Sequence, residues 1–267
     1  MTGYKCTISI LAVSLIWPCW GHPQAAAEDR VSGFVVGGAA SRPDYEGSSD
    51  PEPVPLFAAE VNYKFLSLRA FGDDVELDIS PYESLEFGPI ASFRSGRGDD
   101  VENVTVGRLR QIDDALEAGV FGKLTYQSVF TLRDQLSFGA EFLADTSGTH
   151  DGYVATFGVG YDRQMTDRFG IGLDIKSRYA SEDYMNTYFS IDADNALRSG
   201  LPLYQAGSGI KDVDFQISAE YMLTQNWGIV GIASHKHLLG DAADSPVVAI
   251  EGDEAQQRFG VGLRFKF

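Results

Sequence analysis

Ser234-His235-Lys236-His237 places a serine beside two histidines, a combination that can supply a nucleophile and its base in a hydrolase. Successive side chains of a strand point to opposite faces, so Ser234 and His235 would not meet there. His235 and His237 share a face and could hold a soft divalent ion, but the spacing provides no third ligand. We therefore expect no catalytic residue and no enzymatic activity. The stretch is interpreted as the polar end of a strand, and metal binding by the two histidines stays open.

Two acidic stretches, Asp192-Ala193-Asp194 and Asp241-Ala242-Ala243-Asp244, could bind Ca²⁺, but they lack the ligand spacing of a dedicated calcium loop. We interpret them as solvated loop carboxylates, with Asp192 or Asp194 also suited to cap a short helix over 193–198. Three glycine pairs lie inside strand-like patterns, on the inner face of the strands, and are not phosphate loops: Gly158 and Gly160, Gly170 and Gly172, Gly260 and Gly262. Apart from the open question of the two histidines, the sequence thus predicts no metal ligand, and it predicts no cofactor.

The elements that would position these residues are strands, and the last one is the most regular. Its apolar side chains alternate with small or charged residues, and the chain ends on an aromatic: Phe259, Val261, Leu263, Phe265 and Phe267. Alternation of this kind gives one apolar and one polar face. The closing strand of a transmembrane barrel has this pattern. An edge strand of a soluble sandwich has it too, so this strand alone does not decide the fold.

Alternation along the whole chain predicts twelve strands, or ten if the two shortest, the third and fourth, do not form. The expected ranges are 31–40, 54–63, 65–71, 75–79, 84–94, 115–127, 130–144, 152–164, 167–180, 213–224, 227–239 and from about 256 to the end.

The connections between these strands sort by length. Those after the second, fourth, sixth, eighth and tenth strands are short, whereas 41–53, 95–114, 181–212 and 240–255 are long loops. A barrel inserted from the periplasm has short turns on one side and long external loops on the other. Both signs of charge also occur on the polar faces, which a dry core would not tolerate and a wet lumen would. We therefore predict an all-β fold, a transmembrane antiparallel up-and-down β-barrel.

The first 27 residues have the pattern of a cleaved secretory signal peptide. Lys5 is followed by the apolar stretch Cys6–Trp20 and by the small residues Ala25-Ala26-Ala27. Export and a single barrel domain over 28–267 follow, and both cysteines would leave with the signal. The net charge of −17 argues against nucleic acid as a partner.

From about residue 31 onward the chain resembles the MipA/OmpV family of Gram-negative outer-membrane proteins. The resemblance rests on stretches in the family's order: 42–48, 111–119, 182–189, 196–202, 209–213 and 238–247. Residues 99–106 depart from it, since relatives are often more polar there. The resemblance implies the outer membrane, with its lipid and the barrel assembly machinery as partners. It also implies that this machinery reads the five alternating apolar residues that end on Phe267.

For function, the resemblance implies a non-enzymatic scaffold linked to peptidoglycan, since the name of the founding member points to binding of a murein hydrolase and a murein synthase. A narrow pore for small solutes and a surface adhesin are the alternatives, and a lipid-acting enzyme ranks last. The loop 181–212 carries four large apolar side chains that would be out of place if exposed. We expect it to fold over or into the barrel mouth as a plug through Tyr184, Met185, Tyr188 and Phe189.

Overall fold

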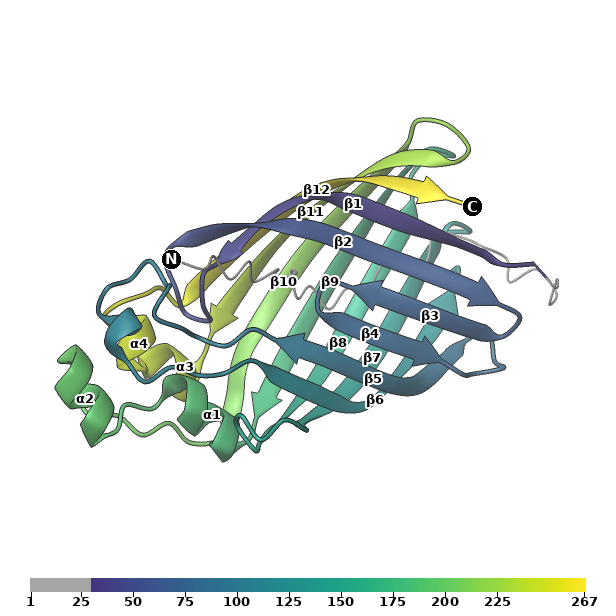
Figure 1. Ribbon diagram of the computed structural model, residues 1–267. Helices are drawn as coiled ribbons and strands as arrows, with labels where there is room; N and C mark the ends of the chain where they lie inside the picture. The colour runs from purple at the N-terminus through teal and green to yellow at the C-terminus, as the bar shows by residue number, and fades with distance from the viewer. Residues whose placement is uncertain (1–29) are drawn as a thin grey trace, which may run out of the picture.

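The computed structural model describes residues 30–267, so the expected signal peptide lies outside the described residues. Twelve strands form a closed antiparallel barrel in which each strand pairs with its neighbours in sequence, and β1 pairs with β12 to close the wall (Figure 1). The predicted fold class is confirmed. The strand count is twelve and not ten, because the short third and fourth strands do form.

The strands alternate in direction around the barrel. Their bounds are β1 (Ser32–Pro43), β2 (Pro51–Tyr63), β3 (Leu66–Phe71), β4 (Asp74–Asp78), β5 (Leu85–Arg94), β6 (Ala115–Gln127), β7 (Asp134–Asp145), β8 (Tyr153–Gln164), β9 (Phe169–Ala180), β10 (Gly209–Met222), β11 (Trp227–Leu238) and β12 (Ala255–Lys266). Short helices lie in the long loops: η1 (Val106–Arg108), α1 (Glu182–Phe189), α2 (Ala193–Ser199), α3 (Gly240–Asp244) and α4 (Pro246–Ala249).

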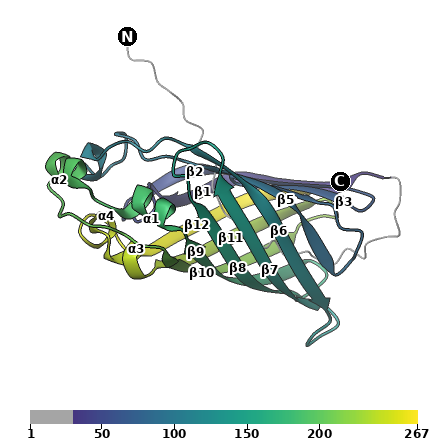
Figure 2. The same cartoon turned by 90° about the horizontal axis from the view of Figure 1, so that it is seen from below.

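The long loops and their helices gather at one end of the barrel, and the C-terminus lies at the other end with the short turns (Figures 1 and 2). We refer to these as the external end and the turn end. Barrels of the outer membrane have their short turns in the periplasm, which gives the two names their orientation. No helix within residues 30–267 is long and apolar enough to cross a membrane.

The alternation of side chains sets the two faces of the wall. In β10, Phe215 and Ile217 are exposed on the outer face, whereas Asp214, Gln216 and Ser218 are buried on the inner face. The register pairs Ile217 with a residue of the same face on each neighbouring strand. A shift of one residue would turn every apolar side chain inward, so this pattern fixes the register.

One part of the lumen is apolar, which the sequence analysis did not predict. Inner-face side chains of β1, β2 and β11 form a buried cluster that includes Val36, Leu56 and Val230. Gly260 and Gly262 face this cluster from β12. A Cβ atom on Gly262 would come within 2.8 Å of Val36 Cγ1, so the absence of a side chain there lets the cluster pack.

The structure extends β1 and β2 into the predicted loop 41–53, which shrinks to 44–50. The expectation of a loop rested on prolines, which lack an N–H for strand pairing. The carbonyl of Phe57 accepts from Gly72 N–H on the side of β3. Odd-numbered residues in this part of β2 therefore point their N–H and C=O groups away from β1. Pro51, Pro53 and Pro55 have the same parity, and therefore cost β2 no hydrogen bond to β1.

The β3–β4 hairpin is too short to fill the wall at the external end. β3 pairs with β2 only from Ala58 to Tyr63. The last pair of β4 and β5 toward the external end joins Asp74 to Ser92. Within residues 30–267, no strand pairs with the range 51–56 of β2 on that side. We refer to this gap in the hydrogen-bond ladder, between 51–56 and the end of β5 above the hairpin tip, as the notch. It is visible in Figure 1 between β2 and β5.

Candidate functional site

Helix α1 buries the side chains that were expected to form a plug. Ser181 Oγ caps the helix by accepting from Tyr184 N–H. Tyr184 and Phe189 are 0% exposed, Met185 is 1% exposed and Tyr188 is 7% exposed. They pack at the external end with apolar residues of β8, β11 and the 239–254 loop. The structure thus brings the four residues together at the mouth, and their role as a plug stays a prediction.

A charged group under α1 contacts its two tyrosines. The Tyr184 and Tyr188 rings lie 4.6 Å apart between centroids, and the Arg94 guanidinium lies 5.0 Å from the centroid of Tyr184. Arg94 Nε and Nη2 donate to the two Glu117 carboxylate oxygens at 2.9 and 3.1 Å. His150 Nε2 lies 3.0 Å from Glu117 Oε1. Burial raises the pKa of both tyrosines, so they remain neutral hydroxyl groups.

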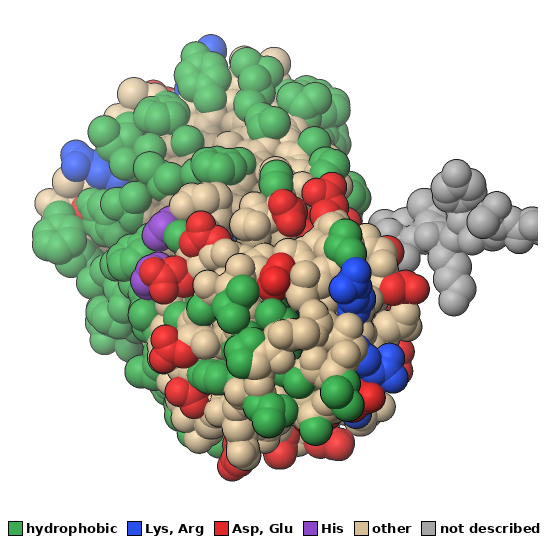
Figure 3. Space-filling model, turned by 90° about the vertical axis from the view of Figure 1, so that its left-hand side faces the viewer, with side chains coloured by type: hydrophobic (Ala, Val, Ile, Leu, Met, Phe, Trp, Pro, Cys, Tyr) green, Lys and Arg blue, Asp and Glu red, His purple; other side chains and the backbone are tan. Residues whose placement is uncertain are grey.

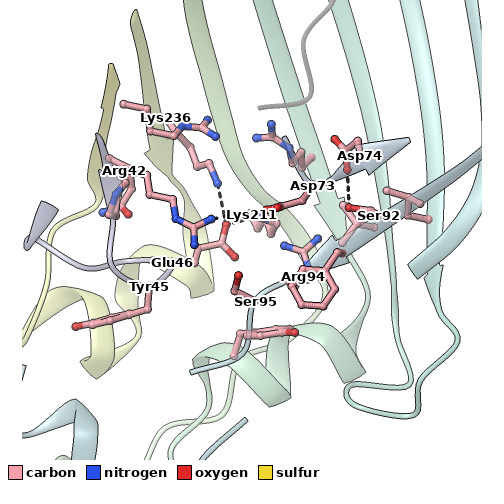
Figure 4. Close-up of a pocket in the computed structure, with 18 of the residues that line it drawn as sticks. Arg42, Tyr45, Glu46, Asp73, Asp74, Ser92, Arg94, Ser95, Lys211 and Lys236 are labelled. Atoms are coloured by element: carbon pink, nitrogen blue, oxygen red, sulfur yellow. Dashed lines mark hydrogen bonds and ion pairs between the residues drawn. The ribbon is translucent and has the colours of Figure 1, made fainter. Parts of the chain in front are cut away.

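Glu46, in the loop between β1 and β2, lies at the mouth beside Lys211 and Lys236 (Figure 4). Its Oε1 accepts from Lys211 Nζ at 2.5 Å and from Lys236 Nζ at 3.1 Å. Its Oε2 accepts from the Tyr184 hydroxyl at 2.8 Å. Burial alone would raise the pKa of Glu46, but Lys211, Lys236 and Arg94 outweigh it and hold this pKa well below the usual range. The carboxylate is therefore charged and ties three segments together.

Opposite charges on the inner face of nearby strands are also paired. Arg178 Nη1 donates to Asp212 Oδ1 at 2.7 Å. Within the β3–β4 hairpin, Arg69 Nε lies 3.3 Å from Glu76 Oε2. Other pairs in the lumen join Lys123 to Glu86, Lys176 to Glu141 and Arg264 to Glu220. The predicted charges of the lumen are thus paired along its length.

A cavity of about 180 Å³ lies at the external end, beside the notch. Its lining includes Glu46 from the first loop, Asp73 from the hairpin tip and Arg94 from β5 (Figure 4). Arg97 lines it as well. A pair of backbone hydrogen bonds with Ile112, both of 2.9 Å, holds Arg97 in place within the 95–114 loop.

A second cavity, of about 930 Å³, lies at the turn end. We refer to it as the vestibule. It is lined by charged and polar side chains that include Asp134, Asp162, Glu220 and Arg264. The vestibule and the smaller cavity thus lie at opposite ends of the described barrel, with paired charges between them.

The structure separates Ser234 from the two histidines that suggested hydrolase chemistry and keeps the histidines on one side of the wall. Ser234 faces the lumen, where its hydroxyl accepts from Arg258 Nε at 3.1 Å. His235 and His237 point outward, with ring centroids 6.2 Å apart, and His237 Nε2 lies 3.8 Å from Glu254. Within residues 30–267, no group of three His, Cys, Asp or Glu side chains is placed to hold a metal ion.

The predicted cap is confirmed: Asp192 Oδ1 accepts from Asn195 N–H at 2.8 Å at the start of α2. The alternating apolar residues of β12 and the C-terminal Phe267 face outward, and Phe267 pairs its backbone with Gly33 of β1 at 3.0 and 3.1 Å. Their reading by assembly machinery stays a prediction.

Four residues of this site were not predicted from the sequence: Glu46, Arg94, Arg97 and Lys211. One signal was available. Glu46, Tyr184 and Lys211 fall within three of the stretches that carried the family resemblance, 42–48, 182–189 and 209–213, and the fold brings these three stretches together at the mouth. Figure 3 looks onto this end, where acidic side chains are scattered over the loops and apolar side chains cover the wall beyond them.

The family described as MltA-interacting protein MipA matches residues 35–267, nearly the whole chain. Among curated proteins, none is similar enough in sequence to count as a relative. Among solved structures, an outer membrane channel from Pseudomonas putida F1 has a TM-score of 0.46 at 10% identity, over 92% of this chain and 99% of that one. For the KdgM porin the TM-score is 0.38 at 10% identity, over 89% and 99%. An anion-selective porin from Comamonas acidovorans gives 0.40 at 8% identity, again over 89% and 99%. We draw no function from these three likenesses.

Proposed function

Because the chain belongs to the MltA-interacting protein MipA family, we propose that this outer-membrane barrel is a non-enzymatic interaction protein. It holds murein hydrolase or murein synthase proteins near the membrane from its turn end. The family's printed description, which names an interaction with MltA, is what suggests this class of partner.

The observation that carries the proposal is a set of buried contacts between the loops and strands at the external end. Glu46, Lys211 and Tyr184 connect two loops and a strand through hydrogen bonds of 2.5 and 2.8 Å. Four large side chains of α1 are buried in the same place. Contacts of this kind narrow the mouth, which favours a role in binding over a role in conduction.

The turn end supplies a surface that fits a periplasmic partner. The turn between β6 and β7 exposes Phe130 by 74% and Leu132 by 92%. Aromatic and aliphatic side chains of this kind are common anchors in protein interfaces. The Phe130 ring contacts Tyr161 edge-on at 5.8 Å between centroids, so Leu132 is the freer of the two.

Site-specific photo-crosslinking in intact envelopes tests the proposal. A photoreactive amino acid replaces Leu132 at the turn end, and Leu197 of α2, which is 88% exposed at the external end, is the matched control. We expect a murein hydrolase or synthase to be captured from position 132 and not from position 197. Capture of no envelope protein from position 132, nor from Tyr82 in the neighbouring turn, would contradict the proposal.

A narrow pore for small solutes is the second candidate, favoured by the vestibule of about 930 Å³ that leads into the lumen. Conductance of the purified protein in planar bilayers separates the two. A closed interaction protein gives no steady ion current, whereas a pore gives discrete steps.

A further inference from the structure

Arg97 is a buried cation whose surroundings differ from those of the other buried arginines at the external end. Arg97 is only 6% exposed. Arg94 and Arg178 each donate to a carboxylate, at 2.9 and 2.7 Å. Among residues 30–267, no carboxylate lies within ion-pair distance of Arg97, and its guanidinium donates only to the carbonyl of Tyr188, at 3.1 Å. A buried charge without a counter-charge is costly, so this position is suited to an anion from outside the chain.

Two hydroxyl groups beside the same cavity also have unused hydrogen-bonding capacity. Ser95 Oγ and Tyr188 Oη are buried, and neither has a hydrogen-bond partner within the described part of the chain. Ser95 and Tyr188 line the cavity together with Arg97. Figure 4 shows Ser95 between Glu46 and Arg94. A hydroxyl group can donate to an anionic oxygen, so these groups complement the guanidinium.

The acidic side chains that line the cavity are already engaged. Glu46 accepts from Lys211, and Asp74 Oδ1 accepts from Ser92 Oγ at 2.5 Å. Asp44 Oδ2 accepts from Glu102 N–H at 2.9 Å. The remaining two are Asp73, 3.7 Å from Arg42, and Glu141, 3.7 Å from Lys176. None of them supplies the missing counter-charge of Arg97.

We propose that the cavity beside the notch is an anion-binding site, in which Arg97, assisted by the hydroxyls of Ser95 and Tyr188, binds the phosphate group of a ligand. The forked guanidinium group of an arginine matches the paired oxygens of a phosphate. A cavity of about 180 Å³ far exceeds the ~10–15 Å³ needed for one water molecule, so it has room for the anionic group and part of its substituent.

The notch offers this site an approach from the side of the barrel. The cavity is lined by Asp73 at the hairpin tip and by Phe93 at the end of β5, which bound the notch. Pro51, Pro53 and Pro55 leave the facing edge of β2 without N–H donors, so the edge is a poor template for another strand that would fill the gap. The notch lies toward the external end, where the headgroups of outer-leaflet lipids lie. The anionic group can therefore come from a lipid headgroup through the notch or from a free solute through the loops.

The test compares the wild-type barrel with Arg97→Gln and with the matched control Arg110→Gln. Arg110 lies in the same loop, and its side chain is 56% exposed. Binding of inorganic phosphate to detergent-refolded protein is measured by calorimetry. Binding of diphosphorylated lipid A is measured in nanodiscs by native mass spectrometry. We expect Arg97→Gln to weaken binding by about ten- to a hundredfold, as expected for the loss of charge-assisted hydrogen bonds, and Arg110→Gln to leave it unchanged.

Tyr188→Phe provides a second variant, because it keeps the buried ring and removes only the hydroxyl. It should weaken binding of the same probe by a smaller factor, whether or not Arg97→Gln folds. Binding of lipid A but not phosphate identifies the headgroup as the source, and the reverse identifies a free solute. Equal binding of both probes by wild type, Arg97→Gln and Tyr188→Phe would overturn the proposal, as would binding of neither probe by wild type. The site is independent of the partner proposed at the turn end.

Discussion

The hydroxyl of Tyr184 donates to Glu46 Oε2 at 2.8 Å, and this hydrogen bond joins helix α1 to the loop between β1 and β2. The other oxygen of Glu46 is held by Lys211 and Lys236. One carboxylate thus connects two external loops to the ends of β10 and β11, and removing its charge should loosen the closure more than any change at the exposed surface.

Glu46→Gln should therefore open the external end. Breaking a buried ion pair by removing one charge costs at most about 3–5 kcal/mol, and here it leaves Lys236 without the negative charge that lies 3.1 Å from its Nζ. We expect ion current in planar bilayers that wild type lacks, and a lower unfolding temperature. Asp194→Asn is the control, since the side chains of Asp194 and of its ion-pair partner Arg198 are each about half exposed. Equal current in the two variants would show that Glu46 does not hold the mouth closed.

The closure should persist in moderate acid. The pKa of Glu46 is held well below its ordinary value of 4.5 by Lys211, Lys236 and Arg94 against the effect of burial. A depressed carboxyl pKa stabilises the folded state above the ordinary pKa, and this contribution is lost only as pH falls through the lowered value. Conductance should thus stay absent from neutral pH down to about 4.5 and rise only below it. An increase already between pH 7 and pH 5 would mean that another group controls the closure.

The register of β9 can be tested with single cysteines. Gly170 and Gly172 face the lumen and Ile171 and Leu173 face outward, and Leu173 is 45% exposed on the wall. In a bilayer the outer positions contact lipid. Cysteines at 171 and 173 should therefore be protected from a water-soluble thiol reagent, whereas cysteines at 170 and 172 should react. The opposite order of reactivity would require a shift of the strand by one residue.

Phe267→Ala should affect assembly more than stability. Its side chain is 44% exposed on the outer wall, so removing the ring should cost less than the ~1.5–3 kcal/mol of a fully buried side chain. Its backbone bonds to Gly33 remain. We expect less protein in the outer membrane of cells and near-normal heat-modifiable migration after refolding in detergent. Val104→Ala, at an exposed external position, is the control. Normal insertion in cells together with failed refolding would reverse the interpretation.

Alternation predicted the barrel because each strand is a local pattern. Strand β6 has the predicted bounds, and the two faces of β9 and β10 are those expected. The same reasoning placed 51–53 in a loop. The sequence shows that a proline lacks an N–H, but it does not show toward which neighbouring strand that N–H would have pointed.

The site was much less accessible to sequence reasoning. Glu46 and Lys211 are 165 positions apart, and their contact depends on the closure of the whole barrel. The four buried side chains of α1 stood out because large apolar residues are unusual in a polar loop. Arg97 did not stand out, because a lone arginine in a polar loop looks like any solvated one until its burial is known.

The short β3–β4 hairpin also has a consequence for the surrounding bilayer. At about 3.3 Å per residue, the six residues of β3 span roughly 20 Å, whereas the fourteen of β10 span roughly 46 Å before tilt. The hydrophobic height of the protein is therefore uneven around its circumference. Hydrophobic matching then requires the membrane beside the hairpin to thin, or its polar surface to dip toward Gly72 and Asp73. The barrel would sit in an asymmetric lipid annulus, with one sector of distorted outer leaflet that moves with the protein.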